Sequence, residues 1–339
     1  MKKILLFGTL FLLILMTPVF AAGSGEAQAT PDKPVVFKGG VTGSPDWQYT
    51  LALNEWAQIV KEKTNGAILI EVFPAEQLGN ERELIERTNL GVIDWCLVGA
   101  GGGGEFAPAF AMFENAFTFK SLEHFENVAF NREFRDELAQ LLEESSNMTF
   151  LGLSLNGVRN VLSIKPFKTP AQANGLRLRV PDVATFKIVA RAIDASATPL
   201  PFGEVYMAIQ QGVADAVEGS PENMVNMKFY EVAKNYVLTE HMIQGLGHFF
   251  NKSAFNKISK AQQEILIDSA FDVMHKYFVA SAEVQDSYMA RLKDEYKINI
   301  IELTDAEKEV FQNRAVEELN KEYIPSWGNL WEKFLDLAN

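Results

Sequence analysis

The sequence has almost no cysteine and little histidine. Of its 339 residues, one is cysteine and four are histidine. A single thiol cannot form an intramolecular disulfide, and Cys96 lies in an apolar run, 93–98, that is typical of a buried strand. The histidines are scattered, with neither a His-Glu-x-x-His motif nor a Cys-His metal spacing, and no Gly-x-Ser-x-Gly motif occurs. The sequence therefore predicts no metal site, no cofactor and no catalytic residues.

Positive charge is also scarce. The chain has 31 lysine and arginine residues against 44 acidic residues, a formal net charge of −13, and no cluster of basic residues. This composition argues against binding to nucleic acid or to an anionic membrane surface. It does not exclude a small anionic ligand, because a distant negative field is screened over roughly 10 Å and local arginines can outweigh it.

Long hydrophobic runs are absent except at the N-terminus. Lys2 and Lys3 precede an apolar segment, 4–16, which is followed by small residues up to Ala22. The segment is short for a membrane span, and its order is that of a secretory signal peptide. We expect a signal peptide at 1–21, cleaved near Ala21, and a flexible leader at 22–34, where small and polar residues dominate. The protein is therefore expected to be exported.

Strand and helix patterns alternate through the rest of the chain. Strands are expected at 35–39, 68–73 and 93–98. One helix is expected to open at Ser44-Pro45-Asp46, with Leu51 on its buried side, and another at Asn80 with Glu83 three residues later. Alternation of this kind predicts a parallel sheet in α/β layers, and the length indicates two domains.

A glycine-rich run, 99–104, literally matches Gly-x-Gly-x-x-Gly, the dinucleotide-binding fingerprint. Its context does not fit that function, because Pro108 interrupts the helix that would carry the pyrophosphate. We interpret the run as a mobile or closely packed loop.

The most informative stretch is 174–221. Residues 175–180 alternate, so that the leucines and Val180 face one side of a strand while Arg177 and Arg179 face the other. Pro181 ends the strand and Asp182 can cap a following helix. Arg179 is thereby fixed at the carboxyl end of a strand, where open α/β sheets bind ligands, although a charged strand residue taken alone is usually solvated. A further helix, 204–211, is expected to stop at Gly212, and a strand at 213–218 to carry acids at its tip.

This stretch resembles the signature of the DctP-type solute-binding proteins of tripartite ATP-independent periplasmic (TRAP) transporters. The matching segments are Gly-Leu-Arg-Leu-Arg-Val-Pro, Pro-Phe-Gly-Glu-Val-Tyr-Met-Ala-Ile-Gln-Gln-Gly and Val-Ala-Asp-Ala-Val-Glu, and the likeness runs from about Val36 to the C-terminal helices. The resemblance implies a periplasmic, type II-like binding protein with two α/β domains, a ligand cleft between them and a long helix, 261–292, across both. Domain I is expected at 35–156 with 245–285, and domain II at 157–244 with 286–339.

The resemblance also implies a set of ligand-binding residues. Arg179 would make the principal ion pair with a ligand carboxylate, and Arg159 would be a second clamp or a hinge arginine paired with a surface acid. The other expected residues of the cleft are Phe202, Asp182, Glu218 and Gly219, with Glu81, Trp47 and Thr42 approaching from the first domain.

Three departures from the family pattern bear on the ligand. Ala216 replaces a frequent glycine, while Gly219 and Gly99 stand where some members carry larger side chains that touch the ligand. They predict a roomier pocket rimmed by acids, which favours a sugar acid such as a uronate or aldonate over sialic acid. The alternative is a C4-dicarboxylate or 2-oxo acid, because Arg159 and Arg179 together can serve two carboxylates.

The expected partners are the small organic acid and the small and large membrane subunits of a TRAP transporter, with the protein itself a monomer. Two other classes share some of these features. A ligand receptor for a signalling system would have the same fold and pocket, and an exported enzyme would need a reactive pair that the sequence does not show.

Overall fold

The computed structural model describes residues 28–338 of the chain, and the expected signal peptide lies outside them. Within this range, one nine-stranded mixed sheet runs through the molecule in the order β2-β1-β3-β8-β4-β7-β5-β6, with β9 paired to β8. The strands are β1 (Val35–Val41), β2 (Ile68–Phe73), β3 (Trp95–Gly99), β4 (Met148–Ser163), β5 (Arg177–Val180), β6 (Ser196–Pro199), β7 (Ala216–Gly219), β8 (Asn235–Asn251) and β9 (Asn299–Glu302).

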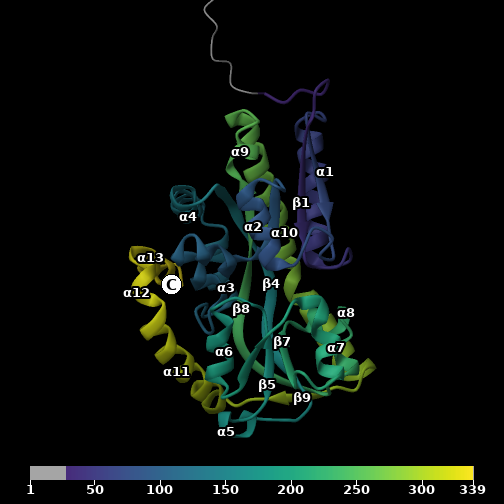
Figure 1. The fold of residues 1–339 in the computed structure, drawn as a ribbon, viewed down its shortest axis with the longest axis vertical. Helices are drawn as coiled ribbons and strands as arrows, with labels where there is room; N and C mark the ends of the chain where they lie inside the picture. Colours follow the sequence, from purple (N-terminus) through teal and green to yellow (C-terminus); the bar gives the residue numbers. More distant parts are fainter. Residues whose placement is uncertain (1–27, 339) are drawn as a thin grey trace, which may run out of the picture.

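Helices cover the sheet on both sides (Figure 1). The α-helices are α1 (Gln48–Lys63), α2 (Glu81–Leu90), α3 (Leu122–Ala129), α4 (Arg132–Ser145), α5 (Pro170–Ala173), α6 (Phe186–Ala192), α7 (Val205–Gln210), α8 (Pro221–Asn226), α9 (Lys252–Phe255), α10 (Lys260–Ala290), α11 (Asp305–Glu322), α12 (Ile324–Trp327) and α13 (Asn329–Asp336). Short 3₁₀ segments are η1 (Ala100–Glu105), η2 (Pro108–Glu114), η3 (Phe202–Glu204) and η4 (Phe229–Glu231), and the π-helical η5 (Arg291–Glu295) follows α10.

Two long antiparallel strands, β4 and β8, join the two halves of the molecule (Figure 1). Strands β1, β2 and β3 lie beside one end of this pair, and β5, β6, β7 and β9 beside the other. The pairing of β4 with β8 shifts register between Leu155 and Gly157 and again between Arg159 and Val161, and such bulges bend a strand. The expected parallel pairing therefore holds for the outer strands and fails at the centre, where β4 and β8 cross between halves.

Helix α10 and the C-terminal arm also span both halves. The 31 residues of α10 pack against α1 and β4 and, further along, against α8. The arm α11–α13, yellow in Figure 1, follows one side of the molecule and contacts α6 through α11 and η2 through α12 and α13. The predicted two-domain α/β fold with a long bridging helix is confirmed. The residue boundaries of the domains remain a proposal, because β4, β8 and α10 belong to both.

Local predictions vary in accuracy. The start of α2 is confirmed, since Asn80 and Glu83 form a capping box and Gly91 ends the helix in the left-handed conformation. The predicted cap at Asp182 is wrong: α6 begins four residues later, after Thr185. Helix α1 begins at Gln48, not at Ser44, and Leu51 is 40% exposed instead of buried.

Part of the expected leader is fixed in place. Ala29 is buried, and its amide donates to Gln262 Oε1 (3.2 Å) while its carbonyl accepts from Gln262 Nε2 (2.8 Å). The chain is thus attached to the start of α10 before β1 begins. None of the helices in residues 28–338 combines the length and the hydropathy that a membrane crossing requires.

Candidate functional site

Arg179 is a buried arginine whose charge no carboxylate neutralises directly. Its side chain is 2% exposed at the end of β5, and Nε and Nη2 both donate to the carbonyl oxygen of Leu200, at 2.9 and 2.5 Å. Within residues 28–338 it forms no ion pair. Burial lowers the pKa of the guanidinium to about 10, so the group is still charged at neutral pH. The charges of Glu218, Glu81 and Glu76 act on this guanidinium from a distance, and a direct anionic partner for it stays a prediction. The alternative of a solvated strand arginine is wrong.

Arg159, by contrast, is already paired. Its Nε and Nη2 atoms contact the two carboxylate oxygens of Glu218 at 2.5 and 2.6 Å, and Nη1 donates to Gln244 Oε1. Both partners are buried. Burial by itself raises the pKa of Glu218, but the charge of Arg159 prevails and holds it at about 2. Arg159 therefore pairs with an internal acid, not a surface one, and its role as a second ligand clamp stays a prediction.

A buried acid that the sequence analysis missed extends this network. Glu114, at the end of η2, accepts from the amide of Gly101 (2.9 Å) and from Gln244 Nε2, which links it to Arg159. Burial raises the pKa of Glu114 to about 8, and this favours the protonated carboxylic acid below that pH. The only sequence signal is one acid within the otherwise apolar run 109–113 and 116–117.

Glu81 and Glu76 face Arg179 from the first half. Glu81 is the first residue of α2, and its Oε1 accepts from the amide of Gly99 at 2.5 Å. Burial raises the pKa of both carboxyls, and the nearby guanidinium of Arg179 partly offsets this. Glu76 Oε1 has no hydrogen-bond partner within residues 28–338. The sequence predicted Glu81 but not Glu76.

Aromatic rings close one wall of the site. The Phe202 ring lies 5.4 Å from Arg179 Cζ, and its centroid is 5.7 Å from that of Trp47. Trp47 is buried behind it. Stacking of this kind holds the guanidinium in place and leaves its remaining donors for a ligand.

These groups surround a cavity of about 230 Å³ between the two halves, which we call the arginine cleft. It is lined by Glu76, Asn80, Glu81, Arg82, Arg179, Pro181, Asp182, Val183, Pro199, Leu200, Pro201 and Phe202. Of the predicted residues, Arg179, Glu81, Asp182 and Phe202 line it. Arg159, Glu218 and Gly219 form a buried layer that does not line the cleft, and neither do Trp47 and the half-buried Thr42.

The glycines that were expected to widen the pocket do not do so. A Cβ atom at Gly99 would clash with Glu114 Oε1, and one at Gly219 would meet Met224 Cε at 2.7 Å and Asn223 Oδ1 at 2.9 Å. The space left by each glycine is filled by another side chain of the same protein. The prediction of a roomier pocket at these two positions is therefore wrong.

Two α/β halves joined by crossover strands, with an unpaired buried cation in the cleft between them, define a two-domain solute-binding protein. The family model of the bacterial extracellular solute-binding proteins, family 7 (DctP), matches residues 39–325, and the chain belongs to this family. Its homologues are TRAP periplasmic solute-binding proteins, which bind small organic acids and work with membrane subunits in the periplasm.

Three proteins illustrate the similarity. A solute-binding protein of Roseobacter denitrificans is 32% identical over 65% of this chain and 67% of the relative. The structure of a TRAP solute-binding protein from Desulfovibrio salexigens with bound orotic acid has a TM-score of 0.83 at 27% identity, covering 90% and 97% of the two chains. One from Sulfitobacter with bound β-D-galacturonate has a TM-score of 0.77 at 26% identity, covering 90% and 98%.

Proposed function

We propose that this TRAP solute receptor binds a sugar acid, a uronate or an aldonate, through its carboxylate. The observation that supports the proposal is the buried, unpaired Arg179 in the arginine cleft. Its remaining N–H donors suit the two oxygens of a carboxylate, and the contact gains strength because water is excluded. The galacturonate bound by the Sulfitobacter relative is a ligand of this kind.

The acids around Arg179 favour a ligand rich in hydroxyl groups. Glu76 and Glu81 present carboxyl oxygens that accept hydrogen bonds, and Glu76 Oε1 has no acceptor role yet within the described residues. A second negative group on the ligand would lie near these acids and be repelled. A hydroxyl donates to them without this cost, so an acid with one carboxylate and several hydroxyls fits best.

Of the competing ligands, a C4-dicarboxylate requires two available cations, whereas a 2-oxo acid with one carboxylate requires one but offers few hydroxyl groups to the acids of the cleft. Arg159 is neutralised by Glu218 and does not line the cleft. One free guanidinium matches one carboxylate. Because Arg159 is paired with Glu218, a ligand with one carboxylate is favoured. Arg159 then holds Glu218 and β7 in position.

The remaining parts of the proposal concern export and assembly. The protein is made with a signal peptide cleaved near Ala21, acts as a monomer and releases its ligand unchanged to the small and large membrane subunits, with no turnover. Adjacent genes for these two subunits would separate transport from a signalling role. Incubation with a sugar acid followed by product analysis tests the absence of turnover.

Isothermal titration with D-glucuronate, D-galacturonate and L-galactonate tests the ligand class. We expect at least one to bind, and to stabilise the protein by roughly 2.7 kcal/mol at 100 times its dissociation constant. Arg179→Ala should weaken binding by more than 100-fold, because it removes the guanidinium that is proposed to bind the ligand carboxylate.

Arg177→Ala is the matched control. Arg177 lies two residues away on the same strand, but it is largely exposed and paired with Asp215 at 2.7 Å. Its loss should leave the affinity unchanged. Equal effects of the two substitutions, or full binding by Arg179→Ala, would show that the assigned ion pair does not exist.

A further inference from the structure

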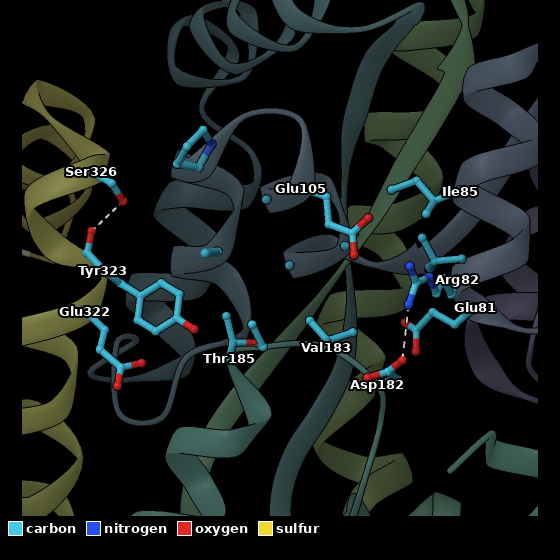
Figure 2. Close-up of a pocket in the computed structure, with 17 residues that line it drawn as sticks. Glu81, Arg82, Ile85, Glu105, Asp182, Val183, Thr185, Glu322, Tyr323 and Ser326 are labelled. Carbon is cyan, nitrogen blue, oxygen red and sulfur yellow. Dashed lines mark hydrogen bonds and ion pairs between the residues drawn. The ribbon is translucent and has the colours of Figure 1, made fainter. Parts of the chain in front are cut away.

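Figure 2 shows the residues that line a second cavity, of about 350 Å³. Both cavities are lined by Glu81, Arg82, Asp182 and Val183, so they are neighbours on either side of the Arg82–Asp182 ion pair. We call the second one the glycine cavity. Its other lining residues are Ile85, Val98, Gly101, Gly102, Gly104, Glu105, Pro108, Ala111, Ala184, Thr185, Glu322, Tyr323 and Ser326.

Two glycines of η1, Gly102 and Gly104, keep this cavity open, whereas the space beside Gly101 is filled by Glu114. A Cβ atom at Gly102 would meet only Ile85 Cδ1, at 3.5 Å, and one at Gly104 would approach Ala111 at 3.4 Å. These distances are ordinary contacts, unlike the clash at Gly99. A side chain at Gly102 would therefore extend into open space, so backbone forms the wall where a larger residue would occupy the cavity.

The cavity wall combines apolar surface with hydroxyl and carboxylate groups. Ile85, Val98 and Ala111 supply apolar carbon, which suits the C–H face of a sugar ring. Figure 2 shows Tyr323 reaching from the C-terminal arm toward Thr185. Thr185 is 2% exposed, and its hydroxyl has no hydrogen-bond partner within the described residues. This unsatisfied hydroxyl beside the cavity is available to a bound polar group.

Charge decides which group this is. Four acids, Glu81, Glu105, Asp182 and Glu322, line the cavity, and Arg82 is the only cation among its lining residues. A second carboxylate would be repelled. An uncharged ring with hydroxyl groups would donate to the acids and to Thr185.

We propose that the glycine cavity is a second subsite, and that the ligand is a disaccharide acid with one carboxylate at Arg179 and a neutral sugar ring in the glycine cavity. The bond between its two rings would replace the exposed Arg82–Asp182 ion pair that separates the cavities. This inference rests on the proposed sugar-acid function. The size of the arginine cleft supports a second subsite. Ligand pockets measure about 300–1,000 Å³, and the arginine cleft alone is smaller than that range.

The test compares three ligands by isothermal titration: galacturonate, a disaccharide of galacturonate and a neutral hexose, and digalacturonate. The disaccharide with one carboxylate should bind at least tenfold more tightly than galacturonate. Digalacturonate should gain nothing over galacturonate, because its second carboxylate meets the acidic wall.

Two substitutions connect the gain to the cavity. Gly102→Leu fills the space and should reduce the affinity for the mixed disaccharide to that for galacturonate, while galacturonate binding is unchanged. Thr185→Val should weaken only the disaccharide, and Thr185→Ser, which restores the hydroxyl, should bind it as the wild type does.

The outcomes separate the two proposals. If galacturonate binds but the mixed disaccharide binds no more tightly, or if Gly102→Leu weakens both ligands equally, the second subsite is refuted and the sugar-acid function stands. If no acid binds and Arg179→Ala changes nothing, both proposals are refuted.

Discussion

At the scale of single residues, the site depends on the different environments of two buried arginines. Arg159 has a carboxylate within 2.5 Å, whereas Arg179 donates to a carbonyl oxygen and to no acid of the described chain. The first arginine is held by this internal ion pair, and its role as a second ligand clamp stays a prediction. The second is held in place before the ligand arrives, so less ordering is required on binding.

Removing Glu218 should destabilise the protein, because it leaves Arg159 buried without a counter-ion. We expect Glu218→Ala to lower the free energy of unfolding in urea by about 3–5 kcal/mol. The double substitution Arg159→Met with Glu218→Leu removes both charges and should recover most of this loss. A single variant as stable as the wild type would mean that the ion pair does not form in solution.

The pH dependence of stability should reveal Glu114. Its pKa is raised from 4.5 to about 8 in the folded protein, so the unfolded chain loses this proton first as the pH rises. The stability that the protonated form provides is complete below pH 4.5 and is lost progressively up to about pH 8. Urea unfolding between pH 5 and about 8 should therefore show less stability at higher pH, and Glu114→Gln, which cannot ionise, should flatten this part of the curve. The same slope in wild type and variant would exclude Glu114 as its source.

At the scale of elements, α2 carries two residues of the arginine cleft at its first turn. Glu81 and Arg82 directly follow the cap Asn80, whose side chain accepts from the Glu83 amide. The position of both side chains therefore depends on how well this helix end is formed. The N-cap of α2 should therefore affect both the arginine cleft and the stability of the protein.

Asn80→Ala should cost about 1 kcal/mol of stability and also weaken ligand binding, because Asn80 both caps α2 and lines the arginine cleft. Ser259→Ala is the matched control, since Ser259 forms the same capping box at the start of α10, away from the cleft. It should cost a similar free energy and leave the affinity unchanged. Chemical denaturation and isothermal titration measure the two effects, and equal loss of affinity in both variants would point to general destabilisation.

At the scale of the whole molecule, the contacts between the two halves include the Trp47–Phe202 ring contact and the ion pair from Arg82 Nη1 to Asp182 Oδ2, at 3.3 Å. Both side chains are more than half exposed, so the pair adds little to overall stability. It joins α2 of the first half to the β5–α6 connection of the second. Its effect should therefore be on closure and not on folding.

Arg82→Ala should increase the dissociation rate of the ligand several-fold, with a change in unfolding free energy below about 1 kcal/mol. Lys38→Ala is the control, because its partner Glu71 lies in the same half of the molecule. Stopped-flow measurements at low and high salt would test this, since screening should remove the difference between wild type and Arg82→Ala. A difference that persists at high salt would exclude the ion pair as the cause.

Features that depend on local or repeated patterns could be predicted from residue order alone. The α2 capping box, the 68–73 strand, the long helix α10 and the position of Arg179 at a strand end follow from residue spacing, and the family follows from the motifs around it. Spacing cannot reveal which side chain occupies a space from a distant part of the chain. Only the tertiary structure showed that Glu114 fills the gap at Gly99, that Glu218 forms its direct ion pair with Arg159 and acts on Arg179 from a distance, and that the central strands are antiparallel. Each of these depends on contacts between residues far apart in sequence, where packing and charge pairing act only once the chain has folded.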